Sequence, residues 1–131
     1  MFGKRNKPNP SVSMDWAELT YDSKIGGWAL SYRDVHFDFP GPQLRMPDKA
    51  KLDIYLDWIE RHREHIDQQV AAMAAGFDDV YVNADAAHVA SIEIEQPNRI
   101  VVMILGAESW GDMGYDLWIE NGEIVNQGFA D

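Results

Sequence analysis

The sequence of 131 residues contains no cysteine, and this absence excludes several kinds of chemistry. Disulfide bonds, thiolate nucleophiles, iron–sulfur clusters and cysteine-ligated zinc all need that side chain. No run of about 18 apolar residues is present either, which argues against a transmembrane helix. Residues 1–13 are basic and proline-containing, and no apolar stretch like that of a secretory signal follows them. We therefore expect a cytoplasmic protein, with 1–13 as a flexible basic tail and 14–131 as a single domain.

Cations are scarce in the second half of the chain. The whole sequence has 11 basic and 22 acidic side chains, which gives a formal net charge of −11. Residues 1–65 are balanced, whereas 66–131 contain twelve acidic residues and a single basic one, Arg99. A general nucleic-acid-binding protein needs a basic face to displace counterions, so this charge argues against nucleic acid as a partner. The asymmetry favours either a solubilising surface or an acidic surface for a basic protein.

Alternation of apolar and polar side chains predicts many strands. The half-buried pattern occurs over 14–22, 28–33, 35–39, 89–95 and 115–120. The stretch 100–105 is apolar on both faces, as expected for a central strand. Asn121-Gly122 is a strong type I′ hairpin signal, and a last strand is expected over 123–129. Residues 77–82 fit either a strand or the end of a helix.

Residues 47–75 predict one long amphipathic helix. Its apolar side chains recur three, four and seven residues apart, and Ile54 and Trp58 widen the apolar stripe. A straight helix of this length would span roughly 43 Å, which favours a break after His65. Because strands and helix are segregated along the chain, we expect an α+β fold. Its antiparallel sheet of about five to seven strands packs against the helix, which follows two or three strands and precedes four.

An acidic segment with two tryptophans is the main candidate for a binding surface. The loop 106–114 is glycine-rich and follows the predicted central strand, and such loops often carry binding residues. Alternation over 115–120 sets a second tryptophan between two acids on one strand face. Tryptophan is enriched in interface hot spots, although either ring could instead fold back over the core. The candidate partner-binding residues are Glu108, Trp110, Asp112, Asp116, Trp118 and Glu120.

Histidines offer a weaker candidate, for metal binding or acid–base chemistry. His62 and His65 lie three residues apart, whereas the known helical zinc signatures need a spacing of four, so a pair of surface histidines is favoured. His36 and Asp38 share one strand face, which fits an acid–base pair, the edge of a metal site or a solvated strand surface. We predict no catalytic residue, no bound metal and no cofactor.

Three segments carry a resemblance to a known group of proteins. They are the β-rich start that ends at Phe37-Asp38-Phe39-Pro40, the helix led by Pro47, and the closing hairpin over 115–129. Their arrangement resembles small acidic bacterial α+β domains of unknown function, some of them immunity proteins of polymorphic or contact-dependent toxin systems. The resemblance implies a cytoplasmic binder that masks the active site of a toxin, often with an acidic surface against a basic nuclease.

Three functions therefore stand as hypotheses. The first is a protein-binding domain with a basic partner, for example an inhibitor of the immunity type, and without nucleic acid or membrane as a partner. The second is a structural or oligomerising domain, as a monomer or homodimer, without a separate site. The third is a metal-binding or hydrolytic enzyme that uses His36, Asp38, His62 or His65.

Overall fold

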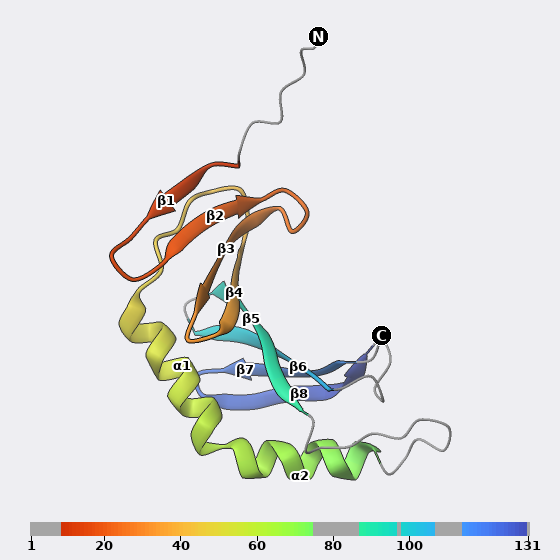
Figure 1. The fold of residues 1–131 in the computed structure, drawn as a ribbon. Helices are drawn as coiled ribbons and strands as arrows, with labels where there is room; N and C mark the ends of the chain where they lie inside the picture. The colour runs from red at the N-terminus through yellow and green to blue at the C-terminus, as the bar shows by residue number, and fades with distance from the viewer. Residues whose placement is uncertain (1–8, 75–86, 97, 107–113, 131) are drawn as a thin grey trace.

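The computed structural model describes residues 9–74, 87–96, 98–106 and 114–130. Within these residues eight strands form one mixed sheet, whose spatial order follows the order of the chain (Figure 1). The strands are β1 Ser11–Ser13, β2 Glu18–Asp22, β3 Gly27–Tyr32, β4 Val35–Pro40, β5 His88–Gln96, β6 Arg99–Leu105, β7 Gly114–Glu120 and β8 Glu123–Ala130. Two helices of the described chain, α1 Lys49–Arg61 and α2 Arg63–Ala74, lie between β4 and β5.

This predominantly β fold corrects the α+β architecture that the sequence predicts. The expected sheet is antiparallel with five to seven strands, whereas β4 and β5 are parallel and pair Asp38 with Glu93. The other neighbouring strands of the described sheet are antiparallel. Parallel neighbours need a long crossover connection, and the helical segment between β4 and β5 provides it. The short strand β1, which lies within 1–13, pairs with β2 and extends the sheet.

The prediction of one long helix over 47–75 is also wrong, because the helix is interrupted at His62. This residue has φ −101° and ψ 8°, outside the α-helical range, and α2 begins at the next position. The break therefore comes before His65 rather than after it. Figure 1 shows α2 turned sharply away from the direction of α1. The turn keeps Ile66 and Val70 buried in the same core as the apolar side chains of α1.

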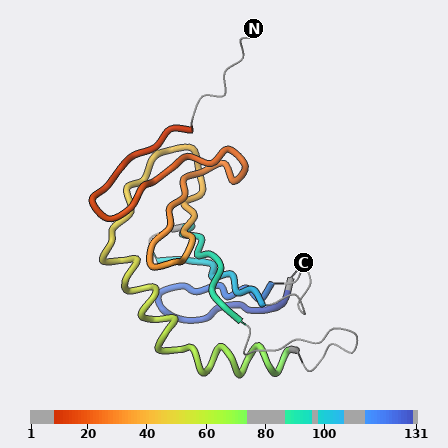
Figure 2. The backbone as a smooth tube through the Cα atoms, in the orientation of Figure 1, coloured from red at the N-terminus to blue at the C-terminus, as the bar shows by residue number. Residues whose placement is uncertain are grey.

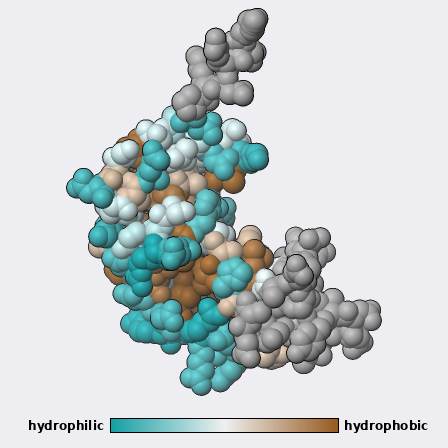
Figure 3. All heavy atoms as spheres, viewed as in Figure 1, coloured by the Kyte–Doolittle hydropathy of each residue, from teal (hydrophilic) through white to brown (hydrophobic). Residues whose placement is uncertain are grey.

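The hydrophobic core lies between the helices and one face of the sheet. The buried apolar residues are Leu19, Trp28, Leu30, Phe37, Phe39, Leu52, Leu56, Ile59, Ile66, Val70, Ala87, Ile92, Ile94, Ile100, Val102, Ile104, Tyr115, Leu117 and Ile119. Figure 3 shows hydrophobic surface in the corner between helices and strands, bordered by hydrophilic surface over the helices. Figure 2 shows that strands at the two ends of the sheet run in clearly different directions. The helices therefore cover one side of a strongly twisted sheet.

The Asn121-Gly122 hairpin predicted from the sequence is confirmed. Both residues have positive φ, +52° and +79°, as a type I′ turn requires, and they connect β7 with β8. The backbone amide of Asn121 donates to the carbonyl of Asn98 at 2.9 Å, which ties this turn to the one between β5 and β6. Residues 77–82, for which the sequence allows strand or helix, lie outside the described residues.

The sequence argues against a transmembrane helix, and the helices of the structure bear on this expectation. In the part of the chain that the structure describes, no helix combines the length and the apolar character that crossing a bilayer would require.

Candidate functional site

The face of the sheet that points away from the helices, which we call the outer face, collects acidic side chains from three strands. β4 contributes Asp38, β5 contributes Glu93 and Glu95, and β7 contributes Asp116 and Glu120. Each of these acids is next in sequence to a buried apolar residue. Because successive side chains of a strand point to opposite faces, burial of the apolar residues turns the acids away from the core.

Three of the six predicted partner-binding residues lie together on the outer face. Asp116, Trp118 and Glu120 alternate along β7, and each is half-buried. β6 runs beside them and pairs Val101 with Trp118 and Met103 with Asp116. The tryptophan thus has an apolar neighbour on one side and acids before and after it along the strand. The other three predicted residues, Glu108, Trp110 and Asp112, lie outside the described residues.

Glu93 is a residue of the outer face that sequence reasoning missed. The parallel pairing of β4 and β5 sets it beside Asp38, and Glu95 follows two positions later on the same strand. Burial, a hydrogen bond with the Glu95 carboxyl and the charge of Asp38 raise the pKa of Glu93 above its ordinary value of 4.5. Keeping Glu93 ionised therefore costs free energy. The alternation over 89–95 predicts its face, but not its neighbour across the sheet.

Two basic side chains offset part of this negative charge. His36 Nε2 lies 2.7 Å from Asp38 Oδ1, which makes an ion pair when the imidazole is protonated. Arg99 Nε lies 3.1 Å from Glu95 Oε1. On β7, burial raises the pKa of Asp116. Among the residues that the structure describes, Asp116 has no ion-pair partner, so its negative charge is available to a partner.

The four weaker metal candidates do not meet at one place. His36 and Asp38 adjoin on the outer face. His62 lies between α1 and α2, where its ring stacks on Trp58 with ring centroids 4.0 Å apart, and its Nδ1 is 2.8 Å from the Trp58 carbonyl oxygen. His65 is exposed on α2. Within the described ranges, no three side chains of His, Asp or Glu are placed to hold a metal ion together.

The resemblance to immunity proteins is neither supported nor opposed by comparison with known proteins. Its residues define an architecture rather than a motif, so a family assignment would have to come from similarity along the chain. No protein-family model, no curated protein and no solved structure matches this chain.

Proposed function

We propose that this chain is a non-enzymatic protein-binding domain whose outer face binds a basic protein. The observation that carries the proposal is the crowding around Glu93, whose carboxyl lies close to those of Asp38 and Glu95 on a partly buried surface. A lysine or arginine side chain of a partner would offset this repulsion and form charge-assisted hydrogen bonds. Trp118 is half-buried on β7, across β6 from Glu93, since Val101 of β6 pairs with both residues. It adds the aromatic area that interface hot spots often use.

The charge distribution supports a protein partner rather than nucleic acid. The net charge of −11 would repel a phosphate backbone and would speed the encounter with a basic protein. Together with the resemblance noted above, it favours a cytoplasmic inhibitor of the immunity type that masks a basic toxin, as a monomer or homodimer. On this proposal the domain acts by covering its partner's surface and performs no chemistry itself.

Binding of a cationic peptide tests the outer face directly. The probe is a fluorescein-labelled peptide, Arg-Ala-Arg-Ala-Arg, blocked at both ends and followed by fluorescence anisotropy at low and physiological salt. The double variant Glu93→Gln/Asp116→Asn should weaken binding roughly tenfold, because it removes two carboxylates from the surface that the cations approach. The interaction should also weaken steeply as salt increases, because exposed charges are screened.

A matched variant separates a specific surface from net charge. Glu60→Gln/Glu64→Gln removes the same number of charges from exposed positions on the helices. The proposal expects this variant to bind the peptide within about twofold of the unmodified protein. Equal weakening by the two double variants would show that the peptide responds to overall charge, and would overturn the assignment to the outer face.

A further inference from the structure

A groove runs along α1 where the helix meets the sheet, and we call it the α1 groove. It consists of two adjoining pockets with volumes of about 240 Å³ and about 250 Å³. The helix and its cap contribute Lys51, Ile54, Tyr55 and Trp58 to the first pocket, and Asp48, Lys51, Leu52 and Tyr55 to the second. Each of these positions in the first pocket comes three residues after one in the second. The pockets are therefore offset by three residues along the helix, or roughly 4.5 Å.

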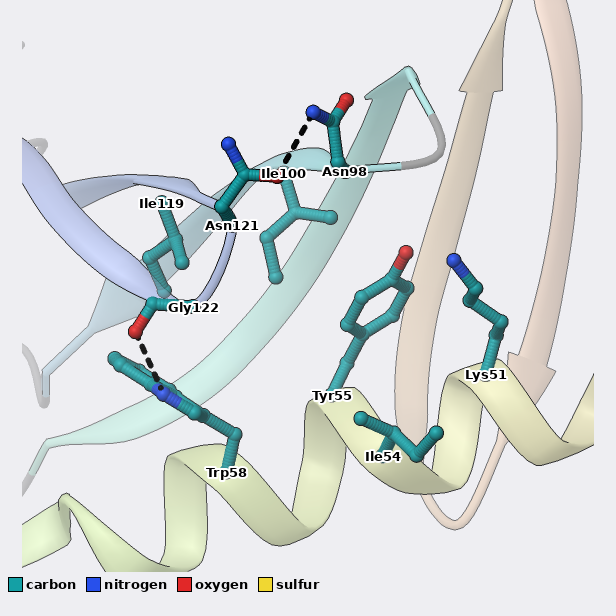
Figure 4. Close-up of a pocket in the computed structure, with 9 residues that line it drawn as sticks. All are labelled: Lys51, Ile54, Tyr55, Trp58, Asn98, Ile100, Ile119, Asn121 and Gly122. Atoms are coloured by element: carbon teal, nitrogen blue, oxygen red, sulfur yellow. Dashed lines mark hydrogen bonds between the residues drawn. The ribbon is translucent and has the colours of Figure 1, made fainter.

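Hydrogen bonds fix the far wall of the first pocket. The indole N–H of Trp58 donates to the carbonyl oxygen of Gly122 at 3.1 Å, and the side chains of Asn98 and Asn121 are hydrogen-bonded at 3.0 Å (Figure 4). These bonds join α1 to the turn between β7 and β8, and that turn to the one between β5 and β6. A wall tied at these points is preorganised, which lowers the entropy lost when a partner binds.

Large apolar side chains stand exposed at both pockets. Met46 lines the second pocket and is 56% exposed, and Ile54 lines the first and is 58% exposed. Leu44, two residues before Met46, is 46% exposed. Scattered exposed apolar residues are ordinary, but these border a preformed apolar groove. A small molecule inside one pocket would leave them in water, whereas a peptide laid along the groove would cover them.

The groove is basic, although the protein as a whole is acidic. Arg45 lines the second pocket, and Lys51 lines both. Among the described residues that line the two pockets, Asp48 is the one acid. It caps α1 by accepting a hydrogen bond from the backbone amide of Ala50, and its charge offsets one of the two cations, so the lining keeps a net positive charge. Asp53 points about 200° around the helix from Lys51 and accepts a hydrogen bond from the Tyr32 hydroxyl at 2.6 Å. The groove therefore favours a negatively charged ligand.

We infer that the α1 groove binds a short acidic peptide segment of a partner protein in extended conformation. Side chains at positions i and i+2 of an extended chain lie on the same side, roughly 6.6 Å apart, and so reach neighbouring pockets. Two apolar side chains occupy the pockets. The acidic residues between them point out of the groove, toward its rim, where the exposed side chains of Arg45 and Lys51 lie. The inference is independent of the outer face, which is acidic and selects ligands of opposite charge.

A designed peptide tests this inference. The probe is fluorescein-labelled Asp-Leu-Glu-Phe-Asp, blocked at both ends and titrated with the full chain while anisotropy is followed. Lys51→Glu and Ile54→Asp should each weaken binding at least about tenfold. Both positions are exposed, so the fold should tolerate the changes, and a thermal melt checks this. The matched control is Ile25→Asp, at an exposed isoleucine that lines neither pocket, and this variant should bind the peptide as the unmodified protein does.

Peptide variants make the result decisive. Asp-Ser-Glu-Ser-Asp lacks both apolar side chains and should bind much more weakly. Lys-Leu-Lys-Phe-Lys reverses the charges, so it should bind only through the acidic outer face, and Ile54→Asp in the groove should not weaken its binding. No binding of the designed peptide at about 1 mM protein, or binding unchanged by Lys51→Glu, would overturn the inference. So would equal binding of Asp-Ser-Glu-Phe-Asp, because a single side chain would then suffice. If the acidic peptide binds and the cationic peptide Arg-Ala-Arg-Ala-Arg does not, the proposed function is overturned and the inference about the α1 groove stands.

Discussion

The outer face and the α1 groove lie on opposite sides of one sheet and differ in nearly every property that governs binding. The outer face crowds carboxylates, including Asp38 and Glu93, because strand register sets them side by side. In the groove, apolar walls are bordered by Arg45 and Lys51. The net charge of −11 therefore agrees with the acidic outer face but gives no indication of the basic α1 groove. In this molecule, charge becomes informative only after each side chain has been placed on a face.

The largest effect on stability is expected from truncating Leu52, the buried side chain under the α1 groove. Leu52 is 1% exposed and lies beneath the second pocket, so Leu52→Ala should lower the free energy of unfolding by about 2–5 kcal/mol. Ile54→Ala, at an exposed wall of the first pocket, should change it by less than about 0.5 kcal/mol while still weakening the acidic peptide. Urea denaturation measures both values. Equal losses would mean that the groove wall is part of the core rather than a separate surface.

A smaller loss of stability is expected from a substitution in the Asn121-Gly122 turn, which lines the first pocket of the groove. Gly122 has φ +79°, so an added Cβ is strained, and Gly122→Ala should cost about 1–2 kcal/mol. Gly26→Ala is the matched control, because Gly26 has φ +65° and open space around it. Urea denaturation should give similar losses for both, and anisotropy should show weaker peptide binding only for Gly122→Ala, which disturbs the turn bonded to Trp58. Weaker binding by both would show that strain at any turn reaches the groove.

The sequence predicts local features of this fold well, because they depend on local pattern. Period-two alternation over 115–120 sets Asp116 and Trp118 on one face, and the structure bears this out. The Asn121-Gly122 turn follows from the need for positive φ at two positions. Neither inference requires knowledge of what lies beside the segment.

What the sequence could not predict depends on contacts between distant segments. The alternation over β5 does not indicate that this strand pairs with β4. The sequence therefore could not predict that Asp38 and Glu93 are neighbours. The break at His62 depends on how two helical halves pack on a twisted sheet, since no proline or glycine marks it. Ile54 fits the apolar stripe of a buried helix face by spacing, yet it is exposed, because the stripe is wider than the sheet's contact.

The smallest effect on stability is expected from a substitution at Glu93, on the outer face. Its pKa is raised in the folded protein by burial and by Glu95 and Asp38, so the folded state binds a proton more tightly than the unfolded state. Ionised Glu93 therefore destabilises the fold at neutral pH, and the unmodified protein regains this free energy as pH falls through the raised pKa. Glu93→Gln should stabilise by about 0.2–1 kcal/mol at pH 7, the range for facing charges of like sign.

The pH dependence separates this explanation from a general effect of the substitution at Glu93. The gain from Glu93→Gln should shrink as pH falls and vanish below the ordinary pKa of 4.5, where the carboxyl is protonated in both states. Denaturation in urea at several pH values measures the difference between variant and unmodified protein. Glu18→Gln is the control, because Glu18 is exposed on β2 opposite Ser13 and has no acid facing it in that pair. A gain at Glu93 that persists at low pH would mean that the amide packs better than the carboxyl, and that crowded charge does not distinguish the outer face from the groove.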